Sequence, residues 1–172
     1  MPKIIAALRS TILARAGEIL LAQGYDRLTM RGVAEACGVA AGTLYNYFPS
    51  KDMLVATVIL EDWQKVLEQM SRIEGGTALL RLEGIFSSLV GFYERYRKLW
   101  QDYSDAGHAS PINGKYHALL VEQLGTQVAR ALEGTQLCSP LLPSFLAETF
   151  LSAAPGGMER FRQLYPILER LI

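Results

Sequence analysis

The stretch from Leu28 to Asp52, LTMRGVAEACGVAAGTLYNYFPSKD, constrains the fold of this chain most strongly. Thr29 is a good N-cap because its hydroxyl can accept a hydrogen bond from a free amide of a first helical turn. Apolar residues then recur at helical spacing as far as Gly38, which can adopt positive φ because it has no Cβ. A second short helix is expected over residues 40–48. A helix, a glycine turn and a second helix together predict a helix-turn-helix unit.

The second helix of such a unit enters the major groove of DNA and presents its solvent face to base edges and phosphates. Four residues of the second helix are expected to face outward: Ala41, Thr43, Tyr45 and Asn46. Leu44 and Phe48 are expected in the core. Ser50 can cap the helix that follows, and Lys51 beside the positive N-terminus of that helix is suited to bind a phosphate.

At these residues the chain resembles the TetR family of one-component transcriptional regulators. The family pattern includes a helix that begins at Thr, a turn of the Ala-Gly-Val type, and Gly-Thr-Leu-Tyr-x-Tyr-Phe followed by Ser-Lys. The matching positions are Thr29, Val33, Ala34, Gly38, Val39, Gly42, Thr43, Leu44, Tyr45, Tyr47, Phe48, Ser50 and Lys51. Ala40 and Ala41 depart from the pattern, because the family commonly has Ser and a polar or basic residue there, and so fewer polar base contacts are expected.

The resemblance implies a DNA-binding head at the N-terminus. Asn46 is the main expected contact to a base edge, whereas Lys51, with Thr29, Thr43 and Tyr47, is expected to hold phosphates. The predicted DNA-binding residues are Thr29, Arg31, Ala40, Ala41, Thr43, Tyr45, Asn46, Tyr47 and Lys51. Arg9 and Arg15 precede the motif, and a solvated face is favoured for both over contact with phosphates.

The charge distribution gives weak support to a head that faces DNA. The formal net charge of the chain is 0, which argues against unspecific adhesion to nucleic acid over the whole surface. Residues 1–60 contain six positive and four negative side chains, a net charge of +2, so the remainder of the chain has −2.

The rest of the sequence has helical periodicity and no pattern typical of strands, so we predict an all-α fold. We expect a helix-turn-helix domain over residues 1–50 and an α-helical ligand-binding and dimerisation domain over residues 51–172. A first helix ends at Gly24, with Tyr25 in the core of the head. A rod over residues 51–74 would measure about 35 Å. Further helices are predicted over residues 79–103, 115–132, 144–153 and 158–171, with a loop over residues 104–114. Gly75 and Gly76 are expected to end the rod, Thr77 and Ser144 to cap the helices that follow them, and Pro166 to kink or break the last helix. Gly84 and Gly91 are each expected to permit close packing of a neighbouring helix or to leave room for a ligand.

Aromatic residues are frequent in the second domain. Core packing is the favoured interpretation for any one of them, but together they would suit an apolar cavity between helices. The resemblance implies a pocket for a small-molecule inducer in this domain. The predicted lining residues are Trp63, Phe86, Tyr93, Tyr96 and Trp100. The predicted polar contacts are Arg97, His108 or His117.

The resemblance further implies a homodimer that binds a palindromic operator in double-stranded DNA. The apolar segments 116–132 and 144–153 are candidates for the dimer interface, although they could equally form the core of one subunit. A repressor that leaves its operator when the ligand shifts the rod is the leading hypothesis. The alternative is a regulator that responds to a protein partner or has no ligand.

Other classes of site and location are not indicated. Cys37 and Cys138 are too far apart in sequence for metal-like spacing, and Cys37 is expected in the core of the head, with a redox switch as the alternative. His108 and His117 do not share a helix face, so no metal site and no cofactor are predicted. We find no nucleophile with a plausible base and predict no enzyme. No apolar run reaches the length of about 20 residues that spans a bilayer, and the chain is expected in the cytoplasm.

Overall fold

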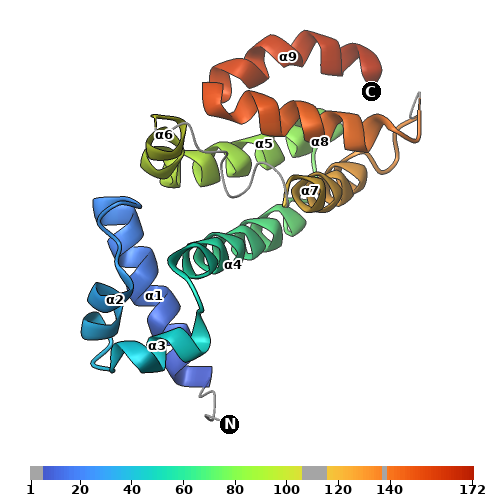
Figure 1. Cartoon of the computed structure of the whole chain (residues 1–172). Helices are drawn as coiled ribbons and strands as arrows, with labels where there is room; N and C mark the ends of the chain where they lie inside the picture. The colour runs from blue at the N-terminus through green and yellow to red at the C-terminus, as the bar shows by residue number, and fades with distance from the viewer. Residues whose placement is uncertain (1–5, 106–115, 137–138) are drawn as a thin grey trace. The chain divides into compact units, whose positions relative to one another are not determined.

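The computed structural model describes residues 6–105, 116–136 and 139–172. Every regular element in these ranges is a helix, which confirms the all-α prediction (Figure 1). None of the helices in the described ranges is both long and apolar enough to cross a membrane. The elements are α1 (Ala6–Gln23), α2 (Met30–Ala36), α3 (Ala41–Tyr47), α4 (Lys51–Ser71), α5 (Ala78–Arg95), α6 (Arg97–Asp105), α7 (His117–Ala131), α8 (Leu142–Ala153), the short 3-10 helix η1 (Ala154–Gly156) and α9 (Met158–Leu171).

The described residues form two compact units. The first contains residues 6–62 and 96–105, and the second contains residues 63–95, 116–136 and 139–172. The division falls inside α4, between Asp62 and Trp63, and again between α5 and α6. These units follow from packing, so the predicted functional division at residue 50 stays a prediction.

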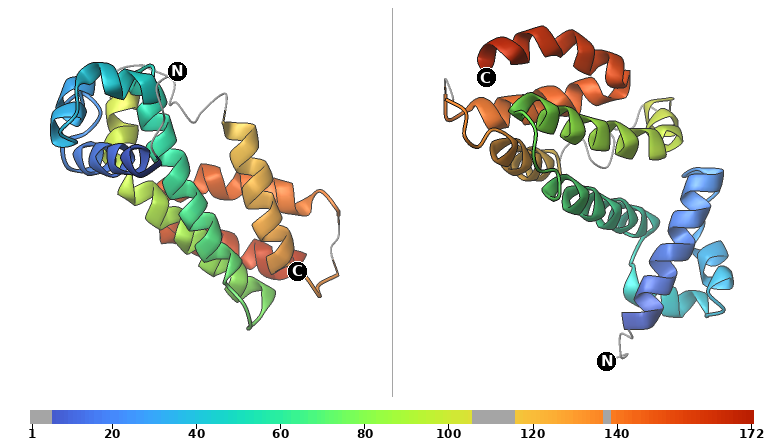
Figure 2. Two further views of the ribbon diagram at one scale, coloured as in Figure 1. Left: turned by 90° about the horizontal axis from the view of Figure 1, so that it is seen from below. Right: turned by 180° about the vertical axis from the view of Figure 1, so that it is seen from behind.

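The first unit is built on the apolar stripe of α1. Ile12, Ala16 and Leu20 recur at three- and four-residue steps and are buried. Gly24 ends the helix as predicted, with φ of 85° and an amide that donates to the carbonyl of Leu20 at 2.9 Å. Figure 1 shows α2 and α3 beside α1, and Figure 2 shows the same arrangement from behind. We call α1, α2, α3 and the first turn of α4 the head.

The helix α6 belongs to the same unit as the head. The hydroxyl of Tyr96 donates to Asp62 at 2.7 Å, and the ammonium of Lys98 donates to the carbonyl of Gln23 at 3.1 Å. A single helix over residues 79–103 was the wrong prediction, because α5 ends at Arg95 and α6 begins at Arg97. Tyr96, the residue that separates the two helices in the sequence, has a buried side chain, so tertiary packing overrides the continuous helical pattern.

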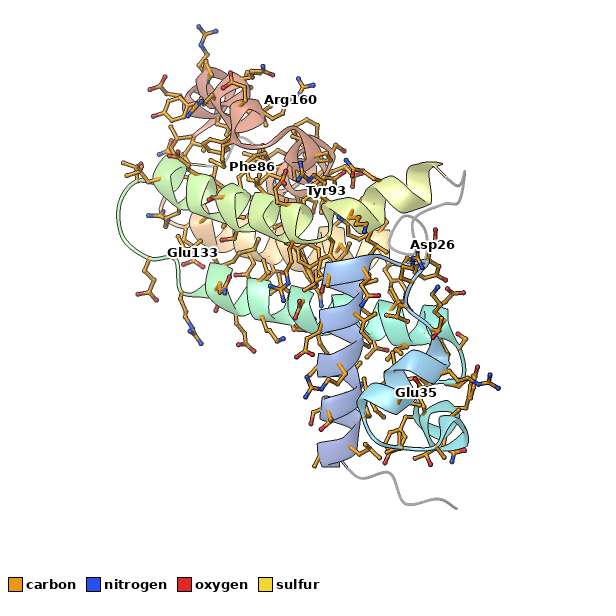
Figure 3. All side chains as sticks on the ribbon, turned by 90° about the vertical axis from the view of Figure 1, so that its left-hand side faces the viewer. Asp26, Glu35, Phe86, Tyr93, Glu133 and Arg160 are labelled. Atoms are coloured by element: carbon orange, nitrogen blue, oxygen red, sulfur yellow. The ribbon has the colours of Figure 1, made fainter. Side chains whose placement is uncertain are left out.

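The second unit contains α5, α7, α8 and α9 (Figure 2), and we call it the body. Its α7 and α8 pack closely, since a Cβ built on Gly125 would lie 3.7 Å from the Cα of Ser144. Phe86 of α5 is fully buried against Phe150 and Phe161 (Figure 3), with ring centroids 5.1 and 5.3 Å away. This aromatic cluster forms the centre of the body.

The predicted helix ends agree with the structure at most positions. Gly75 and Gly76 follow α4 with φ of 74° and 65°, and Thr77 accepts a hydrogen bond from the amide of Leu80 as predicted. A Cβ on Gly84 would approach Ile73 at 3.1 Å, which is the close packing expected at that glycine. Gly91 differs, because no atom within 4 Å would restrict a side chain there.

Three details of α4, α8 and α9 differ from the prediction. The rod ends at Ser71 and not at residue 74. Ser144 does not cap α8, which begins at Leu142 with Pro143 in its first turn, where a missing N–H is tolerated. A break at Pro166 is absent, since α9 continues through this residue, and a kink there stays a prediction. Residues 104 and 105 of the predicted loop belong to α6. The rest of this loop, residues 106–114 with His108, lies outside the described residues.

Candidate nucleic-acid interface

The first helix of the predicted motif is fixed by its N-cap. Thr29 has extended backbone angles, and its Oγ1 accepts a hydrogen bond from the amide of Gly32 at 3.0 Å. Met30, Val33 and Ala34 of α2 are buried in the head. The predicted N-cap is confirmed, and the adjacent side chain of Arg31 stays exposed.

The turn between α2 and α3 depends on one glycine. Gly38 adopts φ of 67°, in the left-handed region that residues with a Cβ disfavour. Its amide donates to the carbonyl of Glu35, and the amide of Val39 donates to the carbonyl of Ala34, both at 3.0 Å. These bonds satisfy carbonyls at the end of α2 and set the direction in which α3 leaves the turn.

The second helix of the motif divides cleanly into an inner and an outer face. Leu44 is fully buried, and Phe48, directly after α3, is 4% exposed, so both core predictions are confirmed. Tyr45 is 50% exposed and Asn46 is also exposed. Ala40 is exposed, while Ala41, Thr43 and Tyr47 are half-buried on or beside the same helix. The outer face of α3 therefore offers a phenol and an amide to a partner.

The N-terminus of α4 adds a cation. Ser50 accepts a hydrogen bond from the amide of Met53 at 3.2 Å, which confirms the predicted cap. The ammonium of Lys51 lies 3.7 Å from the ring centroid of Tyr25, and the hydroxyl of Tyr25 donates to the carboxylate of Asp52. Partial burial lowers the pKa of Lys51, whereas the charges of Asp26 and Asp52 favour its ammonium form.

Tyr25 is the residue of this region that the hydrophobic pattern assigned wrongly. It was expected in the core of the head, but its side chain is only half-buried and its ring lies under Lys51. The signal that could have placed it is its phenol, because a tyrosine near a core needs a polar partner for its hydroxyl. Asp52, directly after Lys51, is that partner.

The arginines of the head have different surroundings. Arg9 forms an ion pair with Glu61 at 2.7 Å, and its guanidinium lies 5.7 Å from the ring centroid of Phe48. Arg15 forms an ion pair with Glu18 at 2.8 Å. Among the described residues Arg31 forms no ion pair. The two arginines of α1 thus pair with carboxylates, whereas the side chain of Arg31 is exposed.

Cys37 lies at the end of α2 and is half-buried. Burial raises the pKa of its thiol, although the charge of Arg15 acts weakly in the opposite direction. A raised pKa reduces the fraction of thiolate, which is the form that oxidants attack. This environment favours the packing role over the redox switch.

The predicted ligand-binding side chains have ring contacts in separate groups. Trp63 lies 5.3 Å from Phe92 and donates through Nε1 to Gln123 at 2.8 Å. Phe86 belongs to the buried cluster of the body, and Tyr93 on the same helix is half-buried (Figure 3). Tyr96 and Trp100 lie 6.1 Å apart in the first unit.

Two of the predicted polar contacts, Arg97 and His117, belong to different units. Arg97 is exposed on the first unit, at the start of α6. In the body, His117 of α7 lies 2.9 Å from a carboxylate oxygen of Glu148 on α8. Within the described residues no group of three or more His, Cys, Asp and Glu side chains could hold a metal ion. The contact of His117 with Glu148 therefore links α7 to α8.

Comparison with known proteins locates the similarity in the head. Residues 12–58 match the family model described as bacterial regulatory proteins, tetR family. The HTH-type transcriptional regulator UidR of Escherichia coli is 35% identical over 68 residues, which are 39% of this chain and 35% of UidR. The HTH-type transcriptional repressor KstR of Rhodococcus jostii is 35% identical over 72 residues, 42% of this chain and 34% of KstR. The matched segments span about a third of the length of these relatives.

Solved structures with the same fold cover nearly the whole chain. Salmonella enterica GusR has a TM-score of 0.70 at 21% identity and covers 99% of this chain and 97% of its own. A TetR-family transcriptional regulator from Rhodococcus sp. has a TM-score of 0.70 at 18% identity and covers 97% and 99% of the two chains. At this identity the likeness concerns the fold alone.

The named relatives are transcriptional regulators, in agreement with the expectation that this chain is not an enzyme. The helix-turn-helix geometry from Thr29 to Lys51 lies wholly inside the matched segment. In its head, this chain is similar to the TetR family of bacterial regulatory proteins.

Proposed function

We propose that this protein is a sequence-specific DNA-binding transcriptional regulator, a homodimeric repressor that leaves a palindromic operator when a small apolar or aromatic molecule binds its body. It would act in the cytoplasm, where operator DNA is found. The observation that carries the proposal is the outer face of α3. Tyr45 and Asn46 are exposed there, on a helix anchored by the buried Leu44 and led by the glycine turn.

Different residues of the head would have different tasks. An amide such as that of Asn46 can bond to the two polar atoms of an adenine edge in the major groove and so read sequence. The ammonium of Lys51 and the guanidinium of Arg31 would contact phosphates, which fix orientation without reading sequence. Ala40 and Ala41 bring no polar group, although a methyl group can contact the methyl of thymine.

The dimer proposal is supported by apolar side chains that remain exposed on the body. Leu124 and Val128 of α7 are fully inaccessible, so that helix packs largely within one subunit, although its Leu119 is 39% exposed. Exposed large apolar residues occur mainly on or beside α8 and α9. With their exposed fractions they are Leu141 (73%), Phe145 (63%), Tyr165 (40%) and Ile167 (56%). Exposed large apolar side chains favour an interface, and a two-fold dimer matches a palindromic site.

The ligand proposal is supported by the aromatic content of the body and by a polar group among its rings. Gln123 accepts from Trp63 next to Phe92, so an amide is available to orient a ligand in that region. Apolar walls with a few polar groups are typical of small-molecule sites. Trp63 and Trp100 are the two tryptophans of the chain, so quenching of intrinsic fluorescence by small aromatic molecules would test this part.

The experiment that tests DNA recognition is selection of random duplexes by the purified protein, followed by sequencing and salt titration. We expect an enriched inverted repeat, whose two halves match the two subunits of a dimer. Weak, salt-sensitive binding without enrichment would contradict sequence-specific recognition. A monomer in light scattering at micromolar concentration would contradict the dimer.

Two variants separate the predicted roles. Asn46→Ala should alter the preference among sequences, with a loss of about 1–3 kcal/mol on the preferred site. Lys51→Ala should weaken binding to all duplexes alike and reduce the slope of log affinity against log salt by about 1 per head. Lys65→Ala, which removes an exposed lysine of the body, is the matched control. Equal effects of the two head variants on all sequences would contradict the assignment.

A further inference from the structure

The start of α4 holds its lysine in an unusual way for a surface cation. A lysine at the first position of a helix ordinarily extends into water on a flexible four-carbon stem. Here the ammonium of Lys51 lies 3.7 Å from the centroid of the Tyr25 ring, well within the range of about 6 Å for a cation–π contact. Its side chain is half-buried. The position of this charge is therefore set by a neighbour and not by the solvent.

The tyrosine is itself fixed at both ends. Gly24 ends α1 in the left-handed region, so Tyr25 is the first residue of the turn that leads toward α2. Its carbonyl accepts from the amide of Leu28, and its hydroxyl donates to the carboxylate of Asp52. The ring therefore bridges the turn after α1 and the first turn of α4, and Lys51 lies on its face.

Two carboxylates, those of Asp26 and Asp52, lie near the ammonium of Lys51 and could compete with the ring for it. Asp26, on the same turn (Figure 3), and Asp52 both act on the charge of Lys51. A lysine without the ring could turn toward either carboxylate and form a surface ion pair. Asp52 instead accepts from the hydroxyl of Tyr25, and the ammonium is held by the ring. The ring thus keeps one cation beside two anions without pairing it directly to either.

Such a cation suits a phosphate. The N-terminus of α4 contributes a partial positive charge beside Lys51, so two favourable terms for an anion coincide at this helix end. An ammonium that already rests on an aromatic face has lost part of its hydration and conformational freedom before the anion arrives. Binding a phosphate then costs less ordering than it would with a free lysine.

We propose that Tyr25 is a positioning residue for DNA binding, whose ring holds the ammonium of Lys51 where a backbone phosphate meets the N-terminus of α4. The inference rests on the proposed function, since it concerns the phosphate contact assigned to Lys51. It adds a residue outside the helix-turn-helix motif, in the turn between α1 and α2. Tyr25 acts through Lys51 and touches no base.

The test compares two substitutions of Tyr25 in the full-length protein. Tyr25→Phe keeps the ring and removes only the hydroxyl that binds Asp52, whereas Tyr25→Leu removes the ring. Tyr25→Leu should weaken binding to the selected duplex and to a random duplex by the same factor, about two- to fivefold per head, the equivalent of one exposed cation–π contact in each head. The salt dependence should not change, because the number of charges at the interface is unchanged. Tyr25→Phe should retain most of the affinity.

The same substitution in the Lys51→Ala background separates positioning from a structural role. If Tyr25 acts through Lys51, Tyr25→Leu should have no further effect on DNA affinity once the lysine is gone. An equal loss in both backgrounds would overturn the inference and identify Tyr25 as a structural support of the head. A failure of the wild-type protein to bind any duplex would instead overturn the proposed function, and this inference with it.

A spectroscopic measurement checks the contact without DNA. In a sample with ¹³C-labelled lysine, the Hε protons of Lys51 should be shifted upfield by the ring current of Tyr25. The shift should persist in Tyr25→Phe and disappear in Tyr25→Leu. An unshifted resonance in the wild-type protein would also overturn the inference.

Discussion

The head and the body use their aromatic side chains in opposite ways. In the head Tyr45 is 50% exposed, and Tyr25 offers its face to a lysine. In the body Phe86, Phe150 and Phe161 are at most 1% exposed and pack on one another. A partner can reach the ring of Tyr45 without any rearrangement of the protein, whereas the rings at the centre of the body are already in contact with each other.

This difference has a consequence for regulation. Protein interiors are packed as densely as organic crystals, so a molecule that enters the centre of the body must separate rings that are in contact. Its binding would then be linked to a rearrangement of α5, α8 or α9, from which these rings come. Such linkage is what a ligand needs in order to shift a conformational equilibrium. A head that is ready for its partner and a body that must change to admit one would suit a repressor with an inducer.

The largest expected effect concerns the buried cluster. Phe86→Ala should destabilise the body by about 3–5 kcal/mol, since it removes the ring that contacts both Phe150 and Phe161 and leaves a cavity. Denaturant unfolding followed by circular dichroism measures this loss. Leu80→Ala, on the same helix but 58% exposed, is the control and should change stability by less than about 0.5 kcal/mol. Similar losses for the two variants would mean that the centre of the body is loosely packed, and the contrast with the head would fail.

The next largest effect concerns the hydrogen bonds that Arg81 donates to backbone carbonyls of the body. The guanidinium of Arg81 donates to the carbonyls of Gly76, Ala131 and Glu133 at 2.8, 2.9 and 3.3 Å. It thereby satisfies carbonyls at the C-terminal end of α7 and in the turn before α5.

Arg81→Met keeps most of the side-chain volume and removes these three donors. We expect a loss of about 1.5–3 kcal/mol in the free energy of unfolding, the usual value for hydrogen bonds to a charged group. Arg162→Met is the matched control, because Arg162 is largely exposed and pairs with the nearby, exposed Glu159. The same chemical denaturation measures both variants. If Arg81→Met were as mild as the control, the end of α7 would be held by packing alone.

The same contrast explains which features could be predicted from the sequence. The N-caps at Thr29 and Ser50 and the turn at Gly38 depend on residues a few positions apart, and all three are present. At the break between α5 and α6, the hydroxyl of Tyr96 donates to Asp62, which lies 34 residues earlier. The helical pattern around Tyr96 gives no sign of this contact. Local chemistry is readable in a sequence, whereas a tertiary contact is not.

The candidate sites follow the same rule. The outward residues of α3 follow from helical periodicity once Leu44 is assigned to the core. The partner of Lys51 could not be found in this way, because Tyr25 is 26 positions away and its aromatic ring fits a core pattern equally well. The aromatic residues of the body were predicted as a set, but whether rings converge on a cavity or on each other depends on how several helices pack. The ring of Phe86 packs against other rings and does not line a cavity among them.

A pair of glycines tests how far the precision of the head depends on its turn. Gly38→Ala should destabilise the head by about 1–2 kcal/mol, because its φ of 67° is unfavourable for a residue with a Cβ. Gly42→Ala should instead stabilise α3 by about 0.5–1 kcal/mol, since Gly42 is helical and no atom lies within 4 Å of the added methyl. Thermal unfolding measures both shifts. Opposite signs support the assigned backbone roles, and a loss at both positions would show that added volume, not φ, limits the turn.

The smallest effect is a change in the rate at which the half-buried thiol of Cys37 is alkylated. Burial raises the pKa of the Cys37 thiol, so at a fixed pH near 8 fewer molecules have the reactive thiolate than in the unfolded chain. In a Cys138→Ser background, alkylation of Cys37 by iodoacetamide should be slower in the native protein than in denaturant at the same pH. Because the folded state favours the protonated thiol, this contribution to stability is present below the unfolded pKa and is lost as the pH rises through the folded pKa. Alkylation that is as fast in the native protein as in denaturant would place Cys37 with the accessible outer face of the head, and would restore the redox switch as the better interpretation.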